Sequence, residues 1–162
     1  MNLIVAADNK WGIGRDGGLL ANLPGDLKYF KEMTTGKVVV MGRKTLESLP
    51  GGKGLPRRTN YVLTSNPKYK AENCTVLHSE DELWEALSAH GSEDIFLIGG
   101  AAIYNNLYKK CDRLYVTKIE ADLDADTFIV NFDDDPDFEI VSESDSFTEN
   151  GITYRFTIYE RV

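Results

Sequence analysis

Cysteines are scarce in this chain, and no segment has the length and hydropathy of a membrane span. Its 162 residues include two cysteines, Cys74 and Cys111, which form no C-x-x-C pattern and are too few to cross-link a secreted fold. No apolar run approaches the roughly 18 residues that cross a bilayer, and residues 1–10 lack the features of a signal peptide. We therefore expect reduced thiols, no membrane association and a cytoplasmic location.

Metal-ligand patterns and a basic surplus are also lacking. His78 and His90 have no Cys, His or acidic partner at a metal-ligand spacing, so we predict no metal site and place both histidines on the surface or in loops. The formal net charge of −8 opposes binding to phosphate backbones. We predict no nucleic-acid partner.

The negative charge is concentrated toward the C-terminus. Residues 120–149 carry twelve Asp or Glu and no Lys or Arg, whereas residues 1–119 carry sixteen Lys or Arg against thirteen acids. We interpret the acidic stretch as a solvated loop and outer strand face. An anionic small ligand would find its cationic partners within residues 1–119.

Strand and helix patterns alternate along most of the chain. The apolar content of 42% and charged content of 27% are typical of a globular protein, and the length fits one domain spanning residues 1–162. Short apolar runs predict strands at 2–7, 37–42, 59–64, 74–77, 94–100 and 113–119. Helical patterns lie at 24–34, 43–49, 80–90 and 101–110.

This alternation predicts an open α/β sheet. The nearly continuous apolar runs VVVM (38–41) and IFLI (95–98) are typical of central parallel strands that are covered on both faces. After residue 119 only strand patterns follow, DFEIVSES (137–144) and ITYRFTIYER (152–161), with a turn at ENG before the second. We expect these strands to form an antiparallel C-terminal edge.

Two predicted strands end in glycine and lead directly into a helix, in VVVMGRKTLES (38–48) and IFLIGGAAIYNN (95–106). Ligands of open α/β sheets bind beyond the carboxyl ends of the strands, where helix starts offer free N–H groups to phosphate. Two such sites suit a dinucleotide, although each motif alone is equally well explained as a plain helix start. GIGRDGG (12–18) fits G-x-G-x-x-G only by coincidence, because no helix follows it.

One carboxylate stands at the start of a predicted helix. In NLPGDLKYF (22–30), Pro24 suits a first helical turn, and Leu27 and Phe30 follow at helical spacing. The free N–H groups and dipole of a helix start explain an acid such as Asp26 in that turn. On these residues alone, a helix-start role is favoured over a catalytic one.

Seven stretches in a fixed order change that balance. They are VAAD, WGIG, NLPGDLKYFKEMT, VVVMGRKTLES, LPRRTNYVLTS, FLIGGAAIY and LYVTKIEADLDADT. Together they resemble the dihydrofolate reductase family over almost the whole chain. The resemblance implies a single-domain eight-stranded mostly parallel mixed sheet with an antiparallel C-terminal edge and helices on both faces. It also implies reduction of 7,8-dihydrofolate to tetrahydrofolate with NADPH, and we expect a monomer that binds antifolate inhibitors.

The resemblance assigns Asp26 as the single pterin-binding carboxylate. Thr117 matches the threonine that bonds it, and these two are the implied catalytic residues. Arg58 matches the arginine that pairs with the glutamate tail, for which a bidentate guanidinium is well suited. The implied substrate-binding set is Ile4, Val5, Asp26, Leu27, Phe30, Leu49, Arg58 and Thr117. Burial is expected to raise the pKa of Asp26 and the helix start to oppose this, and both a proton relay and an electrostatic role stay open.

The cofactor residues are implied in the same way. The two glycine-to-helix motifs match phosphate-binding helix starts, with a cis peptide expected between Gly99 and Gly100. Arg43, Thr64 and Ser65 would hold the 2′-phosphate of NADPH. The implied cofactor-binding set is Ala6, Ile13, Gly42, Arg43, Lys44, Thr45, Thr64, Ser65, Ile98, Gly99, Gly100, Ala101, Ala102, Ile103 and Tyr104. Of these, Ala6, Ile13, Ile98 and Tyr104 would line the nicotinamide pocket.

Two departures from the family pattern concern the loop at 8–23 and the second helix start. Many members have proline and tryptophan where this chain has Leu20 and Ala21, and we expect Leu20 or Trp11 to cover the pterin instead. Ala102 replaces a basic or amide residue of some members. Two other classes stay open: a pyrimidine reductase of riboflavin synthesis, disfavoured by Asp26 and Arg58, and a nucleotide-binding module without turnover.

Overall fold

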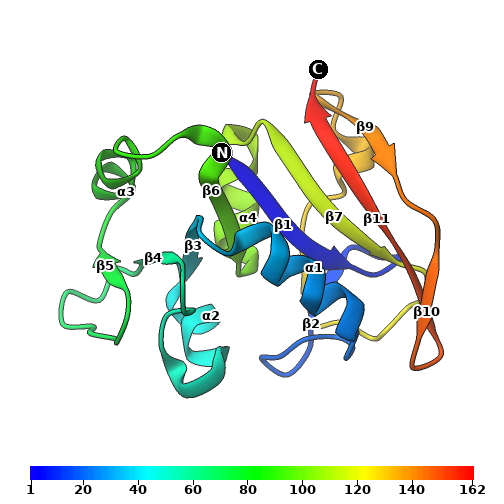
Figure 1. The fold of residues 1–162 in the computed structure, drawn as a ribbon, viewed down its shortest axis with the longest axis horizontal. Helices are drawn as coiled ribbons and strands as arrows, with labels where there is room; N and C mark the ends of the chain where they lie inside the picture. The colour runs from blue at the N-terminus through cyan, green and yellow to red at the C-terminus, as the bar shows by residue number, and fades with distance from the viewer.

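A twisted mixed sheet runs through the middle of the structure, a computed structural model that describes residues 1–162 (Figure 1). Its strands are β1 (Asn2–Ala7), β3 (Val38–Gly42), β4 (Thr59–Leu63), β5 (Thr75–Leu77), β6 (Ile95–Gly99), β7 (Arg113–Ile119), β9 (Phe138–Glu143), β10 (Phe147–Glu149) and β11 (Ile152–Arg161). Their order across the sheet is β5, β4, β3, β6, β1, β7, β11 and β10, and β9 also pairs with β11. The crossovers between parallel strands are therefore long, as in other α/β sheets.

The centre of the sheet is parallel and its C-terminal edge is antiparallel. All pairs from β5 to β7 are parallel, whereas β11 is antiparallel to β7, β9 and β10. Strands β9 and β10 lie one after the other along the outer side of β11, so the sheet has eight strand positions. This confirms the predicted eight-stranded, mostly parallel sheet with an antiparallel C-terminal edge.

Helices cover both faces of the sheet, as predicted. They are α1 (Pro24–Thr34), α2 (Arg43–Ser48), α3 (Glu80–Leu87) and α4 (Ala101–Leu107), with 3-10 turns at Pro50–Gly52, Ser92–Asp94, Tyr108–Lys110 and Phe132–Asp134. Helix α1 lies in front of the sheet in Figure 1 and α4 behind it. The sheet is thus buried on both sides, which explains why its central strands are apolar throughout.

The strand residues alternate between two cores. The larger core holds Leu3 and Val5 of β1 together with residues of α3 and α4. The smaller core holds Ile4 of β1 and Leu46 of α2, with Phe30 of α1 packed against it. Since successive side chains of a strand point to opposite faces, this alternation places α1 and α2 on one face and α3 and α4 on the other.

Element ends differ slightly from the prediction. Helix α3 begins after Ser79, whose side chain accepts a hydrogen bond from the Glu82 amide, and ends at Leu87 rather than at residue 90. Helix α4 ends at Leu107 and continues as a 3-10 turn to Lys110. None of the helices has the length and hydropathy of a membrane span.

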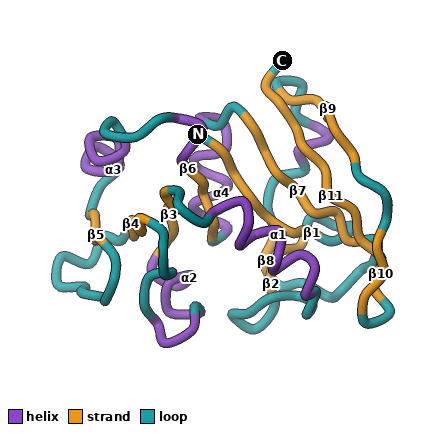
Figure 2. The backbone as a smooth tube through the Cα atoms, viewed as in Figure 1, coloured by secondary structure: helices purple, strands orange, loops and turns teal.

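The sequence patterns did not predict one small sheet. Strands β2 (Gly12–Gly14) and β8 (Thr127–Phe128) pair antiparallel and join the loop after β1 to the segment after β7. Figure 2 shows this pair among the loops below the main sheet, beside the carboxyl end of β1. Segments of two or three residues are too short for periodicity to identify, so only the tertiary pairing defines them.

Candidate active site

The carboxylate of Asp26 lies where the first turn of α1 meets β7. Leu23 precedes the helix without capping it through its side chain, and its carbonyl accepts the Asp26 amide at 3.0 Å. The hydroxyl of Thr117 donates to Asp26 Oδ1 at 2.6 Å. Thr117 is buried and is paired in register with Ala6 of β1. The two residues implied to be catalytic are therefore in direct contact, although they are 91 positions apart.

Burial raises the pKa of Asp26 above its ordinary value. The Thr117 hydrogen bond opposes this rise because it stabilises the carboxylate, and the nearby negative charge of Glu149 adds to it. Burial, as predicted, thus has the largest influence on the pKa of Asp26. A carboxyl group in this setting holds its proton to a higher pH than an exposed aspartate.

The apolar residues of the implied substrate-binding set belong mostly to the face of the sheet that α1 covers. Leu27 is 48% exposed, whereas Phe30 and Leu49 are half-buried against the smaller core, which also contains Ile4. Val5 differs from the prediction, because its side chain packs in the larger core on the opposite face. Alternation along β1 causes this difference, so Val5 is able to face the Asp26 side only through its backbone.

Arg58 lies at the other end of α1. Its Nε donates to Thr34 Oγ1 at 3.2 Å, and its Nη1 donates to the Pro56 carbonyl at 2.9 Å. No carboxylate forms an ion pair with it. Because a helix rises 1.5 Å per residue, the backbone of α1 separates Asp26 from Thr34 by about 12 Å. A carboxyl group and a free guanidinium thus stand at the two ends of one helix.

The helix starts of α2 and α4 lie side by side at the carboxyl ends of β3 and β6. Gly42 and Gly100 precede these helices, and neither start has a side-chain cap. The Gly99–Gly100 peptide is cis, as expected. A Cβ added at Gly99 would lie 3.2 Å from Thr45 Oγ1. The glycines thus keep the backbone close to Thr45 and leave room that side chains would fill, which fits a diphosphate.

The residues implied to hold a 2′-phosphate lie beside this pair of helix starts. Arg43 donates to Glu47 Oε1 at 3.1 Å in an exposed pair one helical turn apart. Thr64 is half-buried and Ser65 is exposed at the end of β4. His78 is a new feature here, because its Nδ1 lies 3.0 Å from the Thr64 carbonyl oxygen. Lys44 and Ala102 are exposed.

The residues implied to line a nicotinamide pocket come from both faces. The hydroxyl of Tyr104 donates to the Ile4 carbonyl at 2.7 Å, and burial raises the pKa of Tyr104, which stays neutral. Ile13 packs against the larger core, as do Ala101 and Ile103 of the wider cofactor-binding set. The remaining two are Ala6, half-buried near Leu23, and Ile98, buried in the smaller core.

Comparison with known proteins agrees with this geometry. The family model for dihydrofolate reductase matches residues 1–161. The dihydrofolate reductase of Bacillus subtilis is 40% identical over 162 residues, covering 99% of this chain and 94% of that protein. That of Enterococcus faecium is 39% identical over 160 residues, covering 97% and 94%. This chain belongs to the dihydrofolate reductase family.

A solved structure of the family is similar over nearly the whole chain. It is a dihydrofolate reductase from Enterococcus faecalis complexed with NADP(H) and RAB-propyl. It matches with a TM-score of 0.86 and 35% identity, covering 99% of this chain and 95% of that one. The sheet order and helix placement described above are therefore those of the family.

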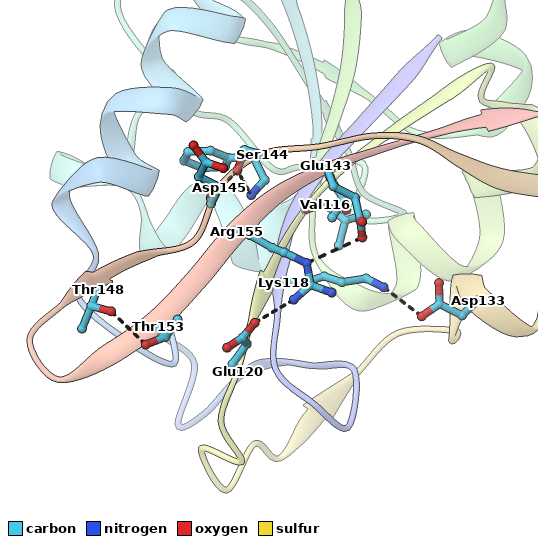
Figure 3. Close-up of polar contacts among 12 residues, drawn as sticks. Val116, Lys118, Glu120, Asp133, Glu143, Ser144, Asp145, Thr148, Thr153 and Arg155 are labelled. Atoms are coloured by element: carbon cyan, nitrogen blue, oxygen red, sulfur yellow. Dashed lines mark hydrogen bonds and ion pairs between the residues drawn. The ribbon is translucent and has the colours of Figure 1, made fainter.

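The position of Trp11 corrects one expectation about how this family member covers its site. The Trp11 ring packs edge-on against Phe132 with 5.3 Å between centroids, and Lys118 Nζ lies 5.6 Å from its centroid. Lys118 follows Thr117 on β7 and points to the opposite face, where it pairs with Asp133 (Figure 3). Trp11 thus lies on the α4 side of the sheet, away from Asp26. Leu20, the other residue expected to replace the family's indole, is half-buried, and the closing of the loop at 8–23 over a bound pterin stays a prediction.

Three acidic residues near the site escaped sequence analysis. Asp8 is buried and accepts hydrogen bonds from the amides of Lys10, Gly12 and Leu123. Asp126 accepts from the Asp16 amide at 2.9 Å. Glu149 accepts from the Gly25 amide at 2.9 Å. Each acid accepts from an amide more than a hundred positions away: Leu123, Asp16 and Gly25 in turn. Local sequence patterns cannot predict such long-range pairs. No group of three metal-ligating side chains is present.

Proposed function

We propose that this chain reduces 7,8-dihydrofolate to 5,6,7,8-tetrahydrofolate with NADPH. The observation that carries this proposal is the Asp26 carboxyl group, which is hydrogen-bonded to Thr117 at 2.6 Å and has its pKa raised by burial. The family membership established above supports the same reaction. The cofactor NADP(H) is bound in the Enterococcus faecalis relative.

In the proposed reaction Asp26 binds the pterin ring. Its carboxyl group hydrogen-bonds the 2-amino group and ring N3, which fixes the ring's orientation in the site. Thr117 donates to Oδ1 and so orients the carboxyl group, whose two oxygens both keep lone pairs for the ligand. Leu27, Phe30 and Leu49 would form the apolar walls and exclude water from the ring.

The raised pKa of Asp26 suits protonation of the pterin. NADPH, when bound, supplies the hydride that adds to C6. N5 must gain a proton in the same reaction, and a carboxyl group whose pKa is raised by burial favours this better than an ordinary aspartate. Asp26 therefore promotes protonation at N5, either by relaying a proton or through its effect on the ring.

The far end of α1 suits the tail of the substrate. Arg58 has no carboxylate partner of its own, and the Thr34 and Pro56 contacts orient its guanidinium. Burial and the neighbouring Arg57 lower the pKa of Arg58, which nonetheless remains a cation at neutral pH. We assign Arg58 to the α-carboxylate of the glutamate tail, a planar anion that a guanidinium binds in a bidentate manner.

The helix starts at Gly42 and Gly100 would hold the cofactor diphosphate. Their uncapped first turns supply backbone N–H donors. Arg43 would exchange its exposed partner Glu47 for the 2′-phosphate, at small cost because exposed ion pairs contribute little. Thr64 and Ser65 lie at the adjacent strand end and would complete this subsite.

A direct assay tests the proposal. Purified protein is mixed with NADPH and dihydrofolate, and oxidation of NADPH is followed by its near-ultraviolet absorbance. We expect turnover with dihydrofolate and much slower turnover when NADH replaces NADPH. Reduction of an aminopyrimidine ribose phosphate in place of dihydrofolate would contradict the proposal, as would NADPH binding without any turnover.

We also propose that residues 1–162 form one domain that acts as a monomer and binds antifolate inhibitors. A cytoplasmic location is proposed on the cysteines: Cys74 and Cys111 are both free, which suits a reducing compartment. The mass in solution measured by light scattering tests the monomer, and a value of twice 18.1 kDa would contradict it.

A further inference from the structure

Glu149 reaches the start of α1 from the opposite end of the chain. It is the last residue of β10, on a hairpin in which Thr148 and Thr153 are hydrogen-bonded across the strands (Figure 3). Glu149 Oε1 accepts from the Gly25 amide at 2.9 Å and from the Tyr154 hydroxyl at 2.6 Å. One carboxylate oxygen therefore links β11 to the residue that precedes Asp26.

The hairpin holds the chain on both sides of the helix start. Beyond the Glu149 contact, Asn150 Nδ2 donates to the Asn22 carbonyl at 2.8 Å. Space is also tight, because a Cβ at Gly25 would lie 2.3 Å from the Tyr154 hydroxyl. A glycine at this position is what allows the hairpin to approach the helix backbone.

Glu149 supplies a cap that the local sequence does not. The first N–H groups of a helix lack partners within the helix, and Ser, Thr, Asp or Asn at the preceding position normally accepts from one of them. Here the preceding residue is Leu23, which has no side-chain acceptor. The carboxylate of Glu149 takes that role from 124 positions away, and a negative charge there also complements the helix dipole.

Glu149 is also the only other acidic side chain among the groups that influence Asp26. The remaining groups are Thr117 on β7, Tyr29 on α1, Tyr104 on α4 and Tyr154 on β11. Burial raises the pKa of Tyr29 and of Tyr154 to about 12, so both phenols are neutral. No lysine or arginine forms an ion pair with Asp26. The charge of Glu149 thus acts on Asp26 without a cation to offset it.

We propose that Glu149 is a positioning residue for Asp26: it fixes the first turn of α1 by accepting from the Gly25 amide, and it brings a negative charge to the helix start that carries Asp26. This inference rests on the proposed function, because it matters to turnover only if Asp26 binds the pterin. Glu149 itself touches neither substrate nor cofactor in this proposal. The contribution of Glu149 to the raised pKa of Asp26 agrees with it.

The test compares Glu149→Gln, Glu149→Ala and the control Glu139→Gln. Glutamine keeps an oxygen acceptor for Gly25 but removes the charge, alanine removes both, and Glu139 lies on β9 outside every ion pair of the structure. The Asp26 carboxyl carbon is titrated by NMR in ligand-free protein. At a fixed pH, Glu149→Gln should lower the ratio of protonated to ionised Asp26 by roughly three- to tenfold, as loss of one nearby charge predicts. Glu139→Gln should leave this ratio unchanged.

Turnover gives a second measurement. The falling limb of kcat against pH should move to lower pH in Glu149→Gln, because Asp26 loses its proton earlier. Glu149→Ala should show the same displacement together with a higher KM for dihydrofolate, since the helix start is no longer held. An Asp26 titration that is the same in wild type, Glu149→Gln and Glu149→Ala would overturn the proposal.

The two proposals fail in different ways. A wild-type protein that does not reduce dihydrofolate would overturn the proposed function, while the titration of ligand-free Asp26 would still decide whether Glu149 acts on it. If Glu149→Ala does not fold, Glu149→Gln alone decides, because it keeps the hydrogen-bond acceptor. Loss of activity in Glu149→Gln without any change in Asp26 titration would indicate a purely structural role and overturn the proposal.

Discussion

The substrate and cofactor sides of the site differ in where their polar contacts come from. On the substrate side, Asp26 accepts a hydrogen bond from Thr117, which is 91 positions away. The Gly25 amide donates a hydrogen bond to Glu149, which is 124 positions away. On the cofactor side, Arg43 is paired with Glu47 one turn along the same helix. The acidic start of α1 on the substrate side is therefore held by the tertiary fold, whereas the Arg43 guanidinium on the cofactor side is held by a local pair.

This difference predicts different consequences of binding. Groups fixed by long-range contacts are in position before the ligand arrives, which lowers the entropy lost when it binds. A cation in an exposed local pair is free to change partner at small cost. We therefore expect substitutions on the substrate side to alter the chemistry and the stability of the fold, and those on the cofactor side to alter affinity.

Asp26→Asn is expected to have the largest effect. Asparagine is nearly isosteric and still accepts from Thr117, but it supplies neither a proton nor a charge. Turnover of dihydrofolate at neutral pH should fall by roughly a hundredfold or more, as is typical on loss of a general acid. NADPH affinity should be unchanged, and activity should partly recover at acid pH, where solvent protonates N5. Turnover within about threefold of wild type at neutral pH would contradict the role of Asp26.

Arg43→Ala tests the cofactor side in the same way. Loss of a charge-assisted contact to the 2′-phosphate should reduce the preference for NADPH over NADH by roughly ten- to a hundredfold. The dissociation constant for NADH and the thermal stability should hardly change. The matched substitution on the substrate side is Arg58→Leu, which should weaken the binding of dihydrofolate but not the binding of NADPH. Equal weakening of both cofactors by Arg43→Ala would instead place Arg43 at the diphosphate.

The sequence predicted the parts of the site that depend on local patterns. The first turn of α1 could be placed because Pro24, Leu27 and Phe30 have the spacing and residue types of an amphipathic helix start. The two glycine-to-helix junctions follow apolar runs that only a central strand explains. The pairing of Asp26 with Thr117 came from family resemblance, since their separation along the chain leaves no periodic trace.

The parts that sequence could not predict depend on tertiary register. Trp11 has a positive φ of 61° and packs against Phe132, a residue of the acidic segment that was interpreted only as a loop and outer strand. Glu149 caps a helix whose own preceding residue is leucine. Local capping rules therefore identify no acceptor for this helix start. The side chain of Val5, a member of the implied substrate-binding set, lies in the larger core, because the phase of β1 relative to α1 depends on sheet packing.

Gly25→Ala should lower the stability of the fold and affect the substrate side of the site but not the cofactor side. Alanine is favoured over glycine in a helix by about 1 kcal/mol. Its Cβ would lie 2.3 Å from the Tyr154 hydroxyl, which is buried and held by Glu149. Overpacking of this kind typically costs roughly 1–3 kcal/mol, so we expect a net loss of unfolding free energy and weaker dihydrofolate binding.

The matched control is Gly18→Ala, where the nearest atom to an added Cβ is 3.8 Å away. Chemical denaturation should show little change for that variant, and NADPH affinity should be the same in both. A Gly25→Ala protein as stable as wild type would mean that the hairpin adjusts and does not fix the helix start.

The pH dependence of stability should show the smallest effect, and its sign follows from the direction of the Asp26 shift. Burial raises the pKa of Asp26 above its ordinary value of 3.8. Between the unfolded and folded pKa values the folded protein then binds more protons than the unfolded chain, so this group's contribution to unfolding free energy falls as pH rises through that interval. Above the folded pKa its full destabilising effect is present.

Asp26→Asn removes this contribution, so the variant should be more stable than wild type at neutral pH. The stability difference should shrink as the pH falls below both pKa values, and urea denaturation at a series of pH values measures it. Hydrogen bonds and nearby cations lower the pKa of several other carboxyl groups, so their contributions are lost as pH falls, with the opposite sign. These groups are common to both proteins and cancel in the difference, which isolates Asp26. Arg43→Ala should show no comparable trend, because Arg43 and its partner Glu47 are both exposed. An Asp26→Asn variant that is less stable than wild type at neutral pH would contradict the destabilising effect assigned to the Asp26 charge.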